Sequence, residues 1–579
     1  MTCGTGIQAK GSAASFRVAT ESEGYTCPIT DPRVVNMPFN STTLTLNRAL
    51  NVSNTLRGNR NPTQPFQGNK DVSGDVVIPV DLKTVGWWFK KLTGAPTTLE
   101  SVAASKSKAT LPATLTIAGG AGAGTFSTGQ TLAAVGDRVI YRASAGTARI
   151  SAFMNTETTP DTVWTLETTR AGGTPAPNIT AAVVIGIARN FAAASPGTIG
   201  VSAGVLTFSA TQVGAVAGRQ VLAAGGRRFK LVENTGTNIW TVVDEYGAPA
   251  TADLAGGTAL DAIEDATLWT HTFKVGATAG LESFVAEKGF TDMGVPMFFR
   301  YTGVKAGQFQ LTAGGDQELV ATISLIGADE EISYQPLSRV DHMTLISSAK
   351  PLADISSNAI NFTAGGQTAV QVGDLVVYRE TTGTLRAGVV VSEDVSNDVF
   401  TLEARSGSST PDATGVTVEA IYPLGDDADL SANLFGDRFH QFDASVAVDS
   451  VTRGDVAEMQ FSFNNQLDGE QYAIGAGGLR DDIPEGIAET GGSMTTLLKG
   501  ADLVEAGAEV AELDMTLAFA RGDSSLSLRL PESNISAANI PISGPEGIRA
   551  SYDFQGYLND DANGSSLVGT LVNEQQLYS

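Results

Sequence analysis

The stretch Gly136-Asp137-Arg138-Val139-Ile140-Tyr141-Arg142 occurs a second time as Gly373-Asp374-Leu375-Val376-Val377-Tyr378-Arg379. A second motif follows each copy at nearly the same spacing. Val163-Trp164-Thr165-Leu166-Glu167 begins 27 residues after Gly136, and Val399-Phe400-Thr401-Leu402-Glu403 begins 26 residues after Gly373. Each unit is a Gly-Asp turn that leads into apolar strands, which predicts a small β-barrel or sandwich.

A third and more degenerate copy runs Gly218-Arg219-Gln220-Val221-Leu222, followed by Ile239-Trp240-Thr241-Val242. For this copy, coincidence among Val-rich strands remains an alternative. We therefore expect three inserted small β modules, at residues 111–191, 192–270 and 346–430.

Nearly everywhere along the chain, short apolar runs bounded by Gly, Thr, Ser, Asn and Asp predict half-buried antiparallel strands. Examples outside the modules are Thr43–Leu46, Val76–Val80, Leu319–Leu325 and Ala550–Gly556, and examples within them are Arg138–Arg142 and Leu375–Tyr378. The fold class is mainly β.

Two segments have helical spacing instead. In Asp81–Leu92 the apolar residues recur every three or four positions, Asp81 can cap the start, and Gly94 lies just past the end. A weaker pattern predicts a second short helix over Ala501–Val510.

A fainter duplication surrounds the modules, since two regions share the order strand, polar loop, strand, short helix and paired strands. The first half (1–110 and 271–345) contains Thr43–Leu46, Val72-Ser73-Gly74, Phe299–Val304, Phe309–Thr312 and Leu319–Leu325. The second half (431–579) contains Gln460–Phe463, Thr490–Ser493, Leu530–Ile535, Asn539–Ile542 and Ile548–Phe554. We interpret these as duplicated β-sandwich or barrel halves, each with a short helix.

Composition limits the function. The 579 residues include 37 Lys+Arg and 62 Asp+Glu, for a formal net charge of -25, which argues against gripping nucleic acid through its phosphates. With 42% hydrophobic residues, disorder is not expected. Cys3 and Cys27 alone cannot build a disulfide framework or a CxxC zinc site. The longest apolar run, Ala181–Ala188, is too short to span a membrane, and no signal peptide is apparent, so we expect a soluble protein made inside the cell.

No pattern supports catalysis, a cofactor or a metal, and we predict none of the three. His271, His342 and His440 lack a neighbouring His, Cys or HExxH partner. The Gly-rich tract Ala118–Gly124 lacks a phosphate-loop motif and is interpreted as a linker. Asn559-x-Asp561-x-Asn563-Gly564 begins like a calcium loop, but Thr570 replaces the required Glu, which favours a hairpin turn. An acidic group with equally weak grounds for a cation is Asp426, Asp427, Asp429 and Asp437.

Four stretches together resemble the major tail tube proteins of long, non-contractile-tailed (siphovirus-type) bacteriophages. They are Asn54–Arg60 with Asn69–Asp75, Leu281–Asp292, Phe299–Gly303 with Leu319–Gly327, and Phe461–Leu467 with Ile542–Ile548. The matching pieces cover about 1–100, 271–345 and 430–579. The inserted modules are a departure from the family pattern.

This resemblance implies sandwiches that join edge to edge into a ring around a channel for genomic DNA, which passes without specific binding. Two halves per chain imply a trimer with pseudo-sixfold symmetry, stacked into a virion tail tube that is assembled in the host cytoplasm without membrane insertion. The partners implied are other copies of the chain and the tail terminator, distal tail and tape measure proteins. The acidity would keep DNA mobile in the channel, or would simply confer solubility.

The resemblance also suggests roles for the loop and the modules. The loop Asn47–Lys70 is expected to reach the next ring through Arg48, Arg57, Arg60 and Lys70, unless it is a solvated surface loop. The modules are expected to project outward, for stiffening or for adhesion to host-surface glycans, with Trp164, Trp240 and Tyr378 in cores rather than as sugar platforms. The competing function is an adhesin or surface-array protein, and a secreted glycan-cleaving enzyme is third.

Overall fold

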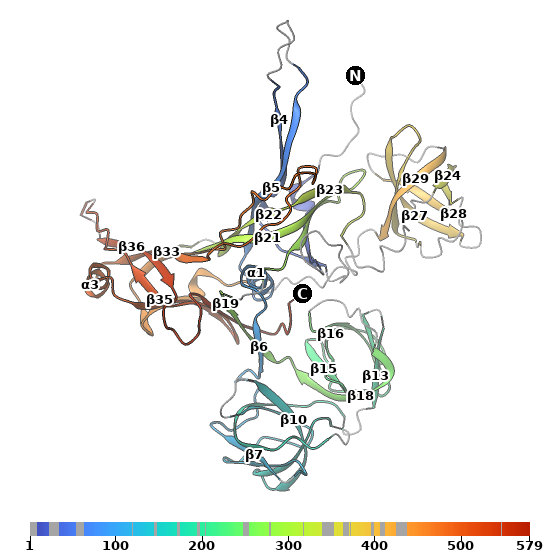
Figure 1. The fold of residues 1–579 in the computed structure, drawn as a ribbon. Coiled ribbons are helices and arrows are strands. Elements are labelled where there is room, and N and C mark those ends of the chain that lie inside the picture. The colour runs from blue at the N-terminus through green and yellow to red at the C-terminus, as the bar shows by residue number, and fades with distance from the viewer. Residues whose placement is uncertain are drawn as a thin grey trace.

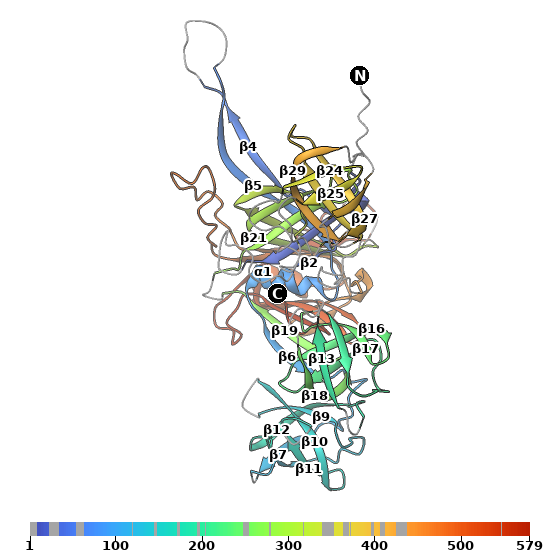
Figure 2. The same cartoon turned by 90° about the vertical axis from the view of Figure 1, so that its right-hand side faces the viewer.

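The protein is mainly β, as predicted: of the residues that the structure describes, 56% lie in strands and 5% in helices. The computed structural model describes residues 9–21, 34–53, 63–118, 120–143, 148–170, 174–193, 197–202, 204–246, 254–276, 280–316, 318–337, 352–362, 370, 372–394, 399–405, 412–423, 437–542, 544–545 and 547–578. No helix in these ranges is long and apolar enough to cross a membrane. A central β body carries a projecting hairpin on one side and two barrels on the opposite side, with a third barrel beside it (Figures 1 and 2).

The first half of the body is built from strands before and after the inserted barrels. Its elements are a 3-10 turn (Gly11–Ala13), β1 (Ala14–Thr20), β2 (Val35–Asn36), β3 (Ser41–Thr42), β4 (Thr45–Asn51), β5 (Phe66–Pro79), α1 (Thr84–Thr93), β6 (Thr97–Ser101), β19 (Leu268–Lys274), β20 (Phe284–Phe290), β21 (Met297–Ala313), β22 (Val320–Gly327) and β23 (Asp329–Ser333).

The second half is continuous in sequence. Its elements are a 3-10 turn (Gln441–Asp443), β30 (Ala444–Val448), β31 (Val451–Arg453), β32 (Val456–Asn464), β33 (Glu489–Leu497), α3 (Asp502–Glu509), β34 (Leu513–Arg521), β35 (Ser524–Ile535), β36 (Arg549–Tyr557) and β37 (Val568–Asn573).

The two halves repeat the same antiparallel pairings. In the first half β1 pairs with β2 and β20, β20 with β21, β21 with β22 and β23, and β5 with β22 and β4. In the second half β30 pairs with β31 and β34, β34 with β35, β35 with β36 and β37, and β33 with β36 and β32. The two glycines in the matched β5 and β33 positions, Gly74 and Gly492, have φ values of 152° and 158°.

The halves are joined edge to edge by β21 and β32. Six antiparallel pairs run from Gln308↔Asn464 to Ala313↔Met459. One sheet therefore continues through β4, β5, β22, β21, β32, β33, β36 and β35, and a single hydrophobic core beneath it contains residues from both halves.

Helix α1 forms where predicted and lies inside this core, between β21 and β19. Asp81 accepts hydrogen bonds from the backbone N–H groups of Lys83 (2.7 Å) and Thr84 (2.8 Å), and Gly94 ends the helix with φ 93°. The spacing did not indicate that Trp87 and Lys91 are also buried. Burial lowers the pKa of Lys91 to about 8 despite its ion pair with Glu282 (2.8 Å). The weaker second helix is also present, as α3.

Three closed six-stranded barrels interrupt or link the halves. The first contains β7 (Thr114–Ala118), β8 (Ala123–Phe126), β9 (Arg138–Arg142), β10 (Arg149–Thr159), β11 (Val163–Glu167) and β12 (Ile179–Ala188). The second contains β13 (Thr198–Ser202), β14 (Val205–Phe208), β15 (Arg219–Ala223), β16 (Arg228–Gly236), β17 (Ile239–Val243) and β18 (Leu254–Asp265). The third contains β24 (Leu352–Ser356), β25 (Ala359–Phe362), β26 (Asp374–Arg379), β27 (Leu385–Asp394), β28 (Val399–Ala404) and β29 (Ala413–Pro423).

The barrels share one topology. When the strands of each barrel are numbered one to six along the chain, the cyclic order is 1-2-5-4-3-6 in all three. The glycine of each repeated motif has a left-handed φ, at 91°, 87° and 100° for Gly136, Gly218 and Gly373. Each of these N–H groups donates a 2.8 Å hydrogen bond to the fourth strand of its barrel. The degenerate second copy therefore has the same fold as the other two, and the motif glycine is required for its turn.

Two interpretations of loops were wrong. The Gly-rich tract Ala118–Gly124 is not a linker, because Ala118 pairs with Ala123 in the β7–β8 hairpin of the first barrel. The segment Asn47–Lys70 is not a loop throughout, since its residues 47–51 and 66–70 extend β4 and β5 into the projecting hairpin, and residues 54–62 lie outside the described residues (Figure 1).

Candidate functional site

The sheet shared by the two halves has one apolar face and one polar face. Alternate residues such as Val76, Ile323 and Phe461 are buried in the core. The residues between them are half-buried or exposed, and most carry hydroxyl or amide groups: Ser73, Thr322, Ser324, Gln308, Gln310, Thr312, Gln460, Ser462, Asn464, Ser493, Thr495, Ser551 and Gln555. Strand alternation places these side chains together on the face opposite the core.

Few charges lie on this polar face. Strand alternation puts the carboxylates of Asp71, Asp75, Glu458, Glu489 and Asp553 on it, together with the basic side chains of Arg549 and of Lys305, which is paired with Glu485. In the first half Asp75 lies opposite Ser324 and accepts its hydroxyl proton at 2.7 Å, and in the second half the matched cross-strand pair is Ser493 with Asp553. Each half thus carries one aspartate at the same place in the repeat, although on different strands.

Side-chain hydrogen bonds also connect the two halves beside their seam, the β21–β32 junction. Asn465, directly after β32, donates from its amide nitrogen to the carbonyl of Leu92 at the end of α1 (2.9 Å) and to that of Ala306 (3.2 Å). Arg480 donates to the carbonyls of Val72 (3.0 Å) and Gly327 (2.6 Å). The loop after β32 is therefore anchored on the first half.

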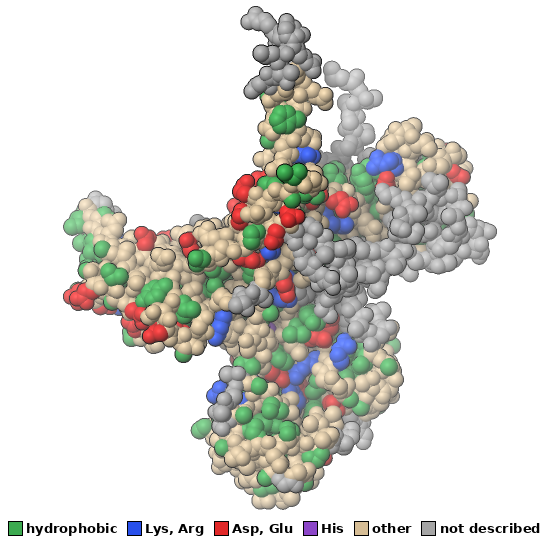
Figure 3. All heavy atoms as spheres, viewed as in Figure 1, with side chains coloured by type: hydrophobic (Ala, Val, Ile, Leu, Met, Phe, Trp, Pro, Cys, Tyr) green, Lys and Arg blue, Asp and Glu red, His purple; other side chains and the backbone are tan. Residues whose placement is uncertain are grey.

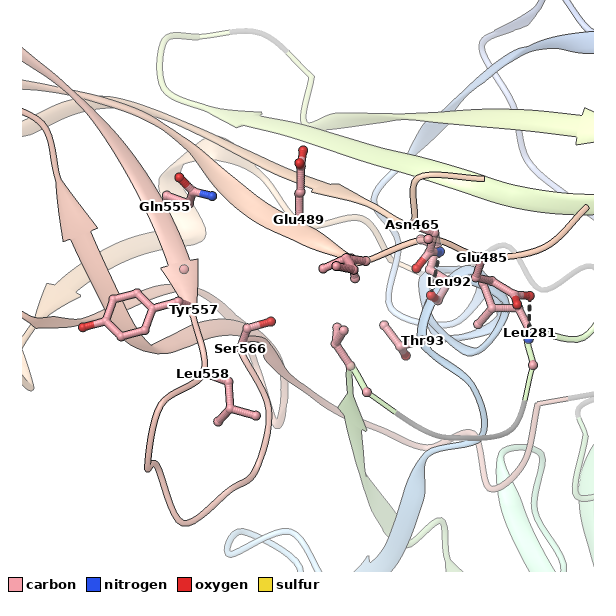
Figure 4. Close-up of a pocket in the computed structure, with 17 residues that line it drawn as sticks. Leu92, Thr93, Leu281, Asn465, Glu485, Glu489, Gln555, Tyr557, Leu558 and Ser566 are labelled. Carbon is pink, nitrogen blue, oxygen red and sulfur yellow. Dashed lines mark hydrogen bonds between the residues drawn. The ribbon is translucent and has the colours of Figure 1, made fainter. Parts of the chain in front are cut away.

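A cavity of about 730 Å³ lies beside this seam, next to the last turn of α1 (Figure 4). Asn465 and Glu485 line one side, and Tyr557 and Leu558 line the other. The Glu485 carboxylate is already engaged by Lys305 (2.8 Å) and the Leu281 N–H (2.9 Å). Among the described residues, no group of three or more His, Cys, Asp or Glu is placed to hold a metal ion.

Both outer edges of the continuous sheet are open in the described part of the chain. At one end, β4 pairs only with β5. At the other end, residues 537–542 follow β35 and contact the sheet through the Asn539↔Ser551 bridge with β36. Unpaired strand edges of this kind favour association with another chain.

The hairpin residues proposed to contact a neighbouring ring differ in their surroundings. Lys70 forms an ion pair with Asp329 of the same chain (2.5 Å), so its ammonium group already has an acidic partner within the chain. Arg48 is exposed and donates to the carbonyl of Gly68 (3.0 Å). Arg57 and Arg60 lie outside the described residues.

The two histidines that the structure describes, His271 and His440, make contacts that stabilise the fold. His271 is buried between Thr98 (2.9 Å) and the carbonyl of Gln575 (2.8 Å), and burial lowers its pKa to about 4. His440 precedes the 3-10 turn of the second half and caps it. His342 lies outside the described residues, as do Cys3, Cys27, Asp426, Asp427 and Asp429.

The calcium-like segment is a turn held by Glu532, whose carboxylate accepts the N–H groups of Asp560 (3.0 Å) and Asp561 (3.1 Å). It joins β36 to β37, and both of these pair with β35 rather than with each other, so the prediction of a hairpin was wrong in that respect. The other member of the acidic group, Asp437, offers its backbone carbonyl to the N–H of Leu82 (2.9 Å).

A buried charge network fixes the first two barrels to the body, and sequence reasoning missed it. Arg138 in β9 is fully buried and bridges Glu100 of β6 (2.7 Å) and Glu264 of β18 (2.7 Å). Arg228 of the second barrel also pairs with Glu100 (2.8 Å). Burial alone would raise the pKa of Glu100, but Arg138 and Arg228 outweigh it and lower that pKa to about 2.

The repeated motif held a signal for this network. The position of Arg138 is occupied by Leu375 in the third barrel. Leu375 is buried against Phe298 of β21, in a small apolar cluster that docks the third barrel on the body. The same position of the motif is therefore Arg138 where the barrel meets buried carboxylates and Leu375 where the barrel meets an apolar surface.

Acidic side chains gather near the base of the projecting hairpin in the space-filling view, whereas Lys and Arg are scattered (Figure 3).

The whole arrangement defines a class: a duplicated β-sandwich with two open edges, one polar sheet face and laterally attached barrels. The chain matches the family described as "Phage tail tube protein" over two segments, residues 11–388 and 381–556.

The chain therefore belongs to the phage tail tube protein family, and it is a structural component of the virion tail. Membership implies self-assembly into a tube together with other tail proteins. No curated protein matches the chain.

Proposed function

We propose that three copies close into a ring with pseudo-sixfold symmetry, and that stacked rings form the tube of a long, non-contractile tail. The observation that carries this proposal is the internal repeat. Two halves with matching strand pairings are already joined edge to edge, while the outer edges of the same sheet remain open. Repeating that junction between chains gives a closed head-to-tail ring.

The polar face of the shared sheet is the proposed channel surface for genomic DNA. Its hydroxyl and amide side chains offer weak, replaceable contacts, and its excess of carboxylates repels phosphates. Because repulsion decays over about 8 Å at physiological salt, Asp75 and Asp553 matter more than acidic residues elsewhere. General acidity for solubility remains the competing explanation of the charge.

We place the inserted barrels on the tube exterior. The first two lie between β6 and β19, which pair with each other on the far side of α1 from β21. The third barrel docks on Phe298, in the first part of β21. This part pairs with β20 and β23, whereas the later part of β21 pairs with β32. These attachment points support insertion at residues 111–191, 192–270 and 346–430 without blocking a channel.

Stiffening of the tube is the better supported role for the barrels. The barrel aromatic residues whose side chains the structure describes are buried or half-buried, including Trp164, Trp240 and Tyr378, as expected of core residues. Sugar-binding sites usually need exposed aromatic faces, so adhesion to host glycans is a second candidate. The tail terminator, distal tail and tape measure proteins are the proposed partners at the ends and interior of the tube.

Electron cryomicroscopy of assembled tubes tests the ring. We expect three chains per ring, six similar lobes around an opening, and barrels outside. Six whole chains per ring, or particles without an opening, would contradict the proposal.

Charge insertion tests the channel surface. In phage carrying Ser462→Lys, tubes should form but DNA ejection should slow, because lysines would attract the phosphates. Thr207→Lys, on the exposed face of the second barrel, is the matched control and should eject DNA normally. Equal rates for both variants would argue against this face lining the channel.

A further inference from the structure

We infer that residues 537–542 of one copy pair with Thr42–Asn47 of the next copy, in the register already used inside the chain by β21 and β32. This inference rests on the proposed ring and names its contact surface and register. The partner is a second copy of this chain.

The register follows from matched pairings. Gly74 and Gly492 occupy the same place in the two halves, opposite Leu325 and Phe554 respectively. In the first half, Ala306 of β21 pairs with Leu325 of β22, and Gln310 pairs with Thr322. Four residues along β21 therefore match three residues along β22, which marks a bulge in β21. In the second half Ile535 pairs with Phe554 and Asn539 with Ser551, which is the same four-to-three irregularity.

Residue equivalences follow directly. Gln310, Leu311 and Ala313 correspond to Asn539, Ile540 and Ile542. On the other side of the seam, Phe461 and Ser462 of β32 correspond to Leu44 and Thr45. The internal pairs Gln310↔Ser462 and Leu311↔Phe461 therefore predict Asn539↔Thr45 and Ile540↔Leu44 between copies.

Backbone directions allow this pairing. Asn539 exchanges both hydrogen bonds with Ser551 (2.9 and 3.0 Å), so its N–H and C=O face β36. Alternation then turns the backbone groups of Ala538, Ile540 and Ile542 toward the open edge. Pro541, which has no N–H, falls on the side facing β36, where a partner copy needs no donor.

Side-chain exposure also marks this edge. Leu311 and Ala313 are buried beneath the internal seam, whereas their counterparts Ile540 and Ile542 are half-buried and 77% exposed. Val510, at the end of α3, is 63% exposed. Hydrophobic side chains are visible on this end of the molecule, which carries α3 and β36 (Figure 3). A neighbouring copy seated as inferred would cover them.

On the receiving edge, Leu44 shows how the single chain satisfies its backbone. Its N–H donates to the Thr42 hydroxyl (3.2 Å), and its carbonyl accepts from the Lys288 ammonium. Both hydrogen-bond partners of the Leu44 backbone are side chains. Pairing with the next copy would replace them with the C=O and N–H of Ile540.

Disulfide trapping tests the register. The pair Asn539/Thr45 lies at a position without mutual backbone hydrogen bonds, where Cα atoms are about 4.5 Å apart, within the disulfide range. In tubes carrying Asn539→Cys and Thr45→Cys, with Cys3 and Cys27 replaced by Ser, oxidation should give covalent dimers and trimers and no larger ladder. Ile540→Cys with Thr45→Cys is the matched control, shifted by one residue to the opposite face, and should not cross-link.

Tubes that form normally but stay uncross-linked, or that cross-link better through the shifted pair, would overturn this seam and leave the ring intact. Should the variants not assemble, hydrogen exchange of the natural protein decides. Protection of amides 538, 540 and 542 in tubes relative to free chains would support the inference, and unchanged exchange would overturn it. Failure of the ring itself would be seen separately by microscopy, as a different number of chains or no opening.

Discussion

Replacing Arg138 with Met should release the first two barrels from the body. The Arg138 guanidinium makes four hydrogen bonds, at 2.7 and 3.1 Å to Glu100 and at 2.7 and 2.9 Å to Glu264. Without it, the fully buried Glu264 carboxylate keeps a 3.2 Å contact from Gln220, while Glu100 still has Arg228. Stranding a buried charge in this way costs about 3–5 kcal/mol.

Limited proteolysis under native conditions measures the effect. A cost of 3–5 kcal/mol raises the open population by a factor of about 10²–10³ or more, and cleavage between the body and the barrels should accelerate accordingly. Lys108→Met is the matched control in the same barrel, because the buried Asp137 carboxylate that loses this pair (3.0 Å) keeps hydrogen bonds from the N–H groups of Ala134 and Asn190 (2.9 Å each), so the variant should cost less than Arg138→Met.

A second variant separates the charge effect from general damage. Arg138→Met combined with Glu264→Gln removes the stranded carboxylate and should recover part of the lost protection. If Arg138→Met were cleaved no faster than Lys108→Met, the network would not hold the barrels and the reasoning would fail.

Three further predictions follow from single positions. Gly492→Ala should destabilise the body by about 3 kcal/mol or more in denaturant titration, because the added Cβ would lie 1.9 Å from the carbonyl oxygen of Gln460; Gly256→Ala, in open space, should be near neutral. Trp164→Ala should cost about 3–5 kcal/mol, measured as a lower melting temperature of the first barrel, with the body unaffected. Since burial lowers the folded pKa of His271 to about 4, stability is full above the unfolded pKa of about 6.5 and falls with acidity, by about 2 kcal/mol at pH 5; His271→Gln should remove that dependence, and an unchanged pH profile would contradict it.

The candidate site was predictable only in part. Strand alternation in segments such as Gln460–Phe463 already indicated one polar and one buried face, and family resemblance supplied the expectation of a ring. Which carboxylates share the polar face was not accessible, because Asp75 and Asp553 are far apart in sequence and come to the same face only through the pairings of β22, β21, β32 and β33.

Local sequence patterns were enough to predict the elements: the repeated Gly-Asp motifs, the mainly β class, and helix α1 with Asp81 and Gly94 at its ends. These depend on side-chain periodicity and turn residues, which act over a few positions along the chain. That Phe309 lies opposite Phe463, and that Arg138 reaches Glu264, could be seen only in the folded chain. Strand partners and buried ion pairs join residues more than a hundred positions apart, so their choice depends on how the whole core packs and not on local pattern.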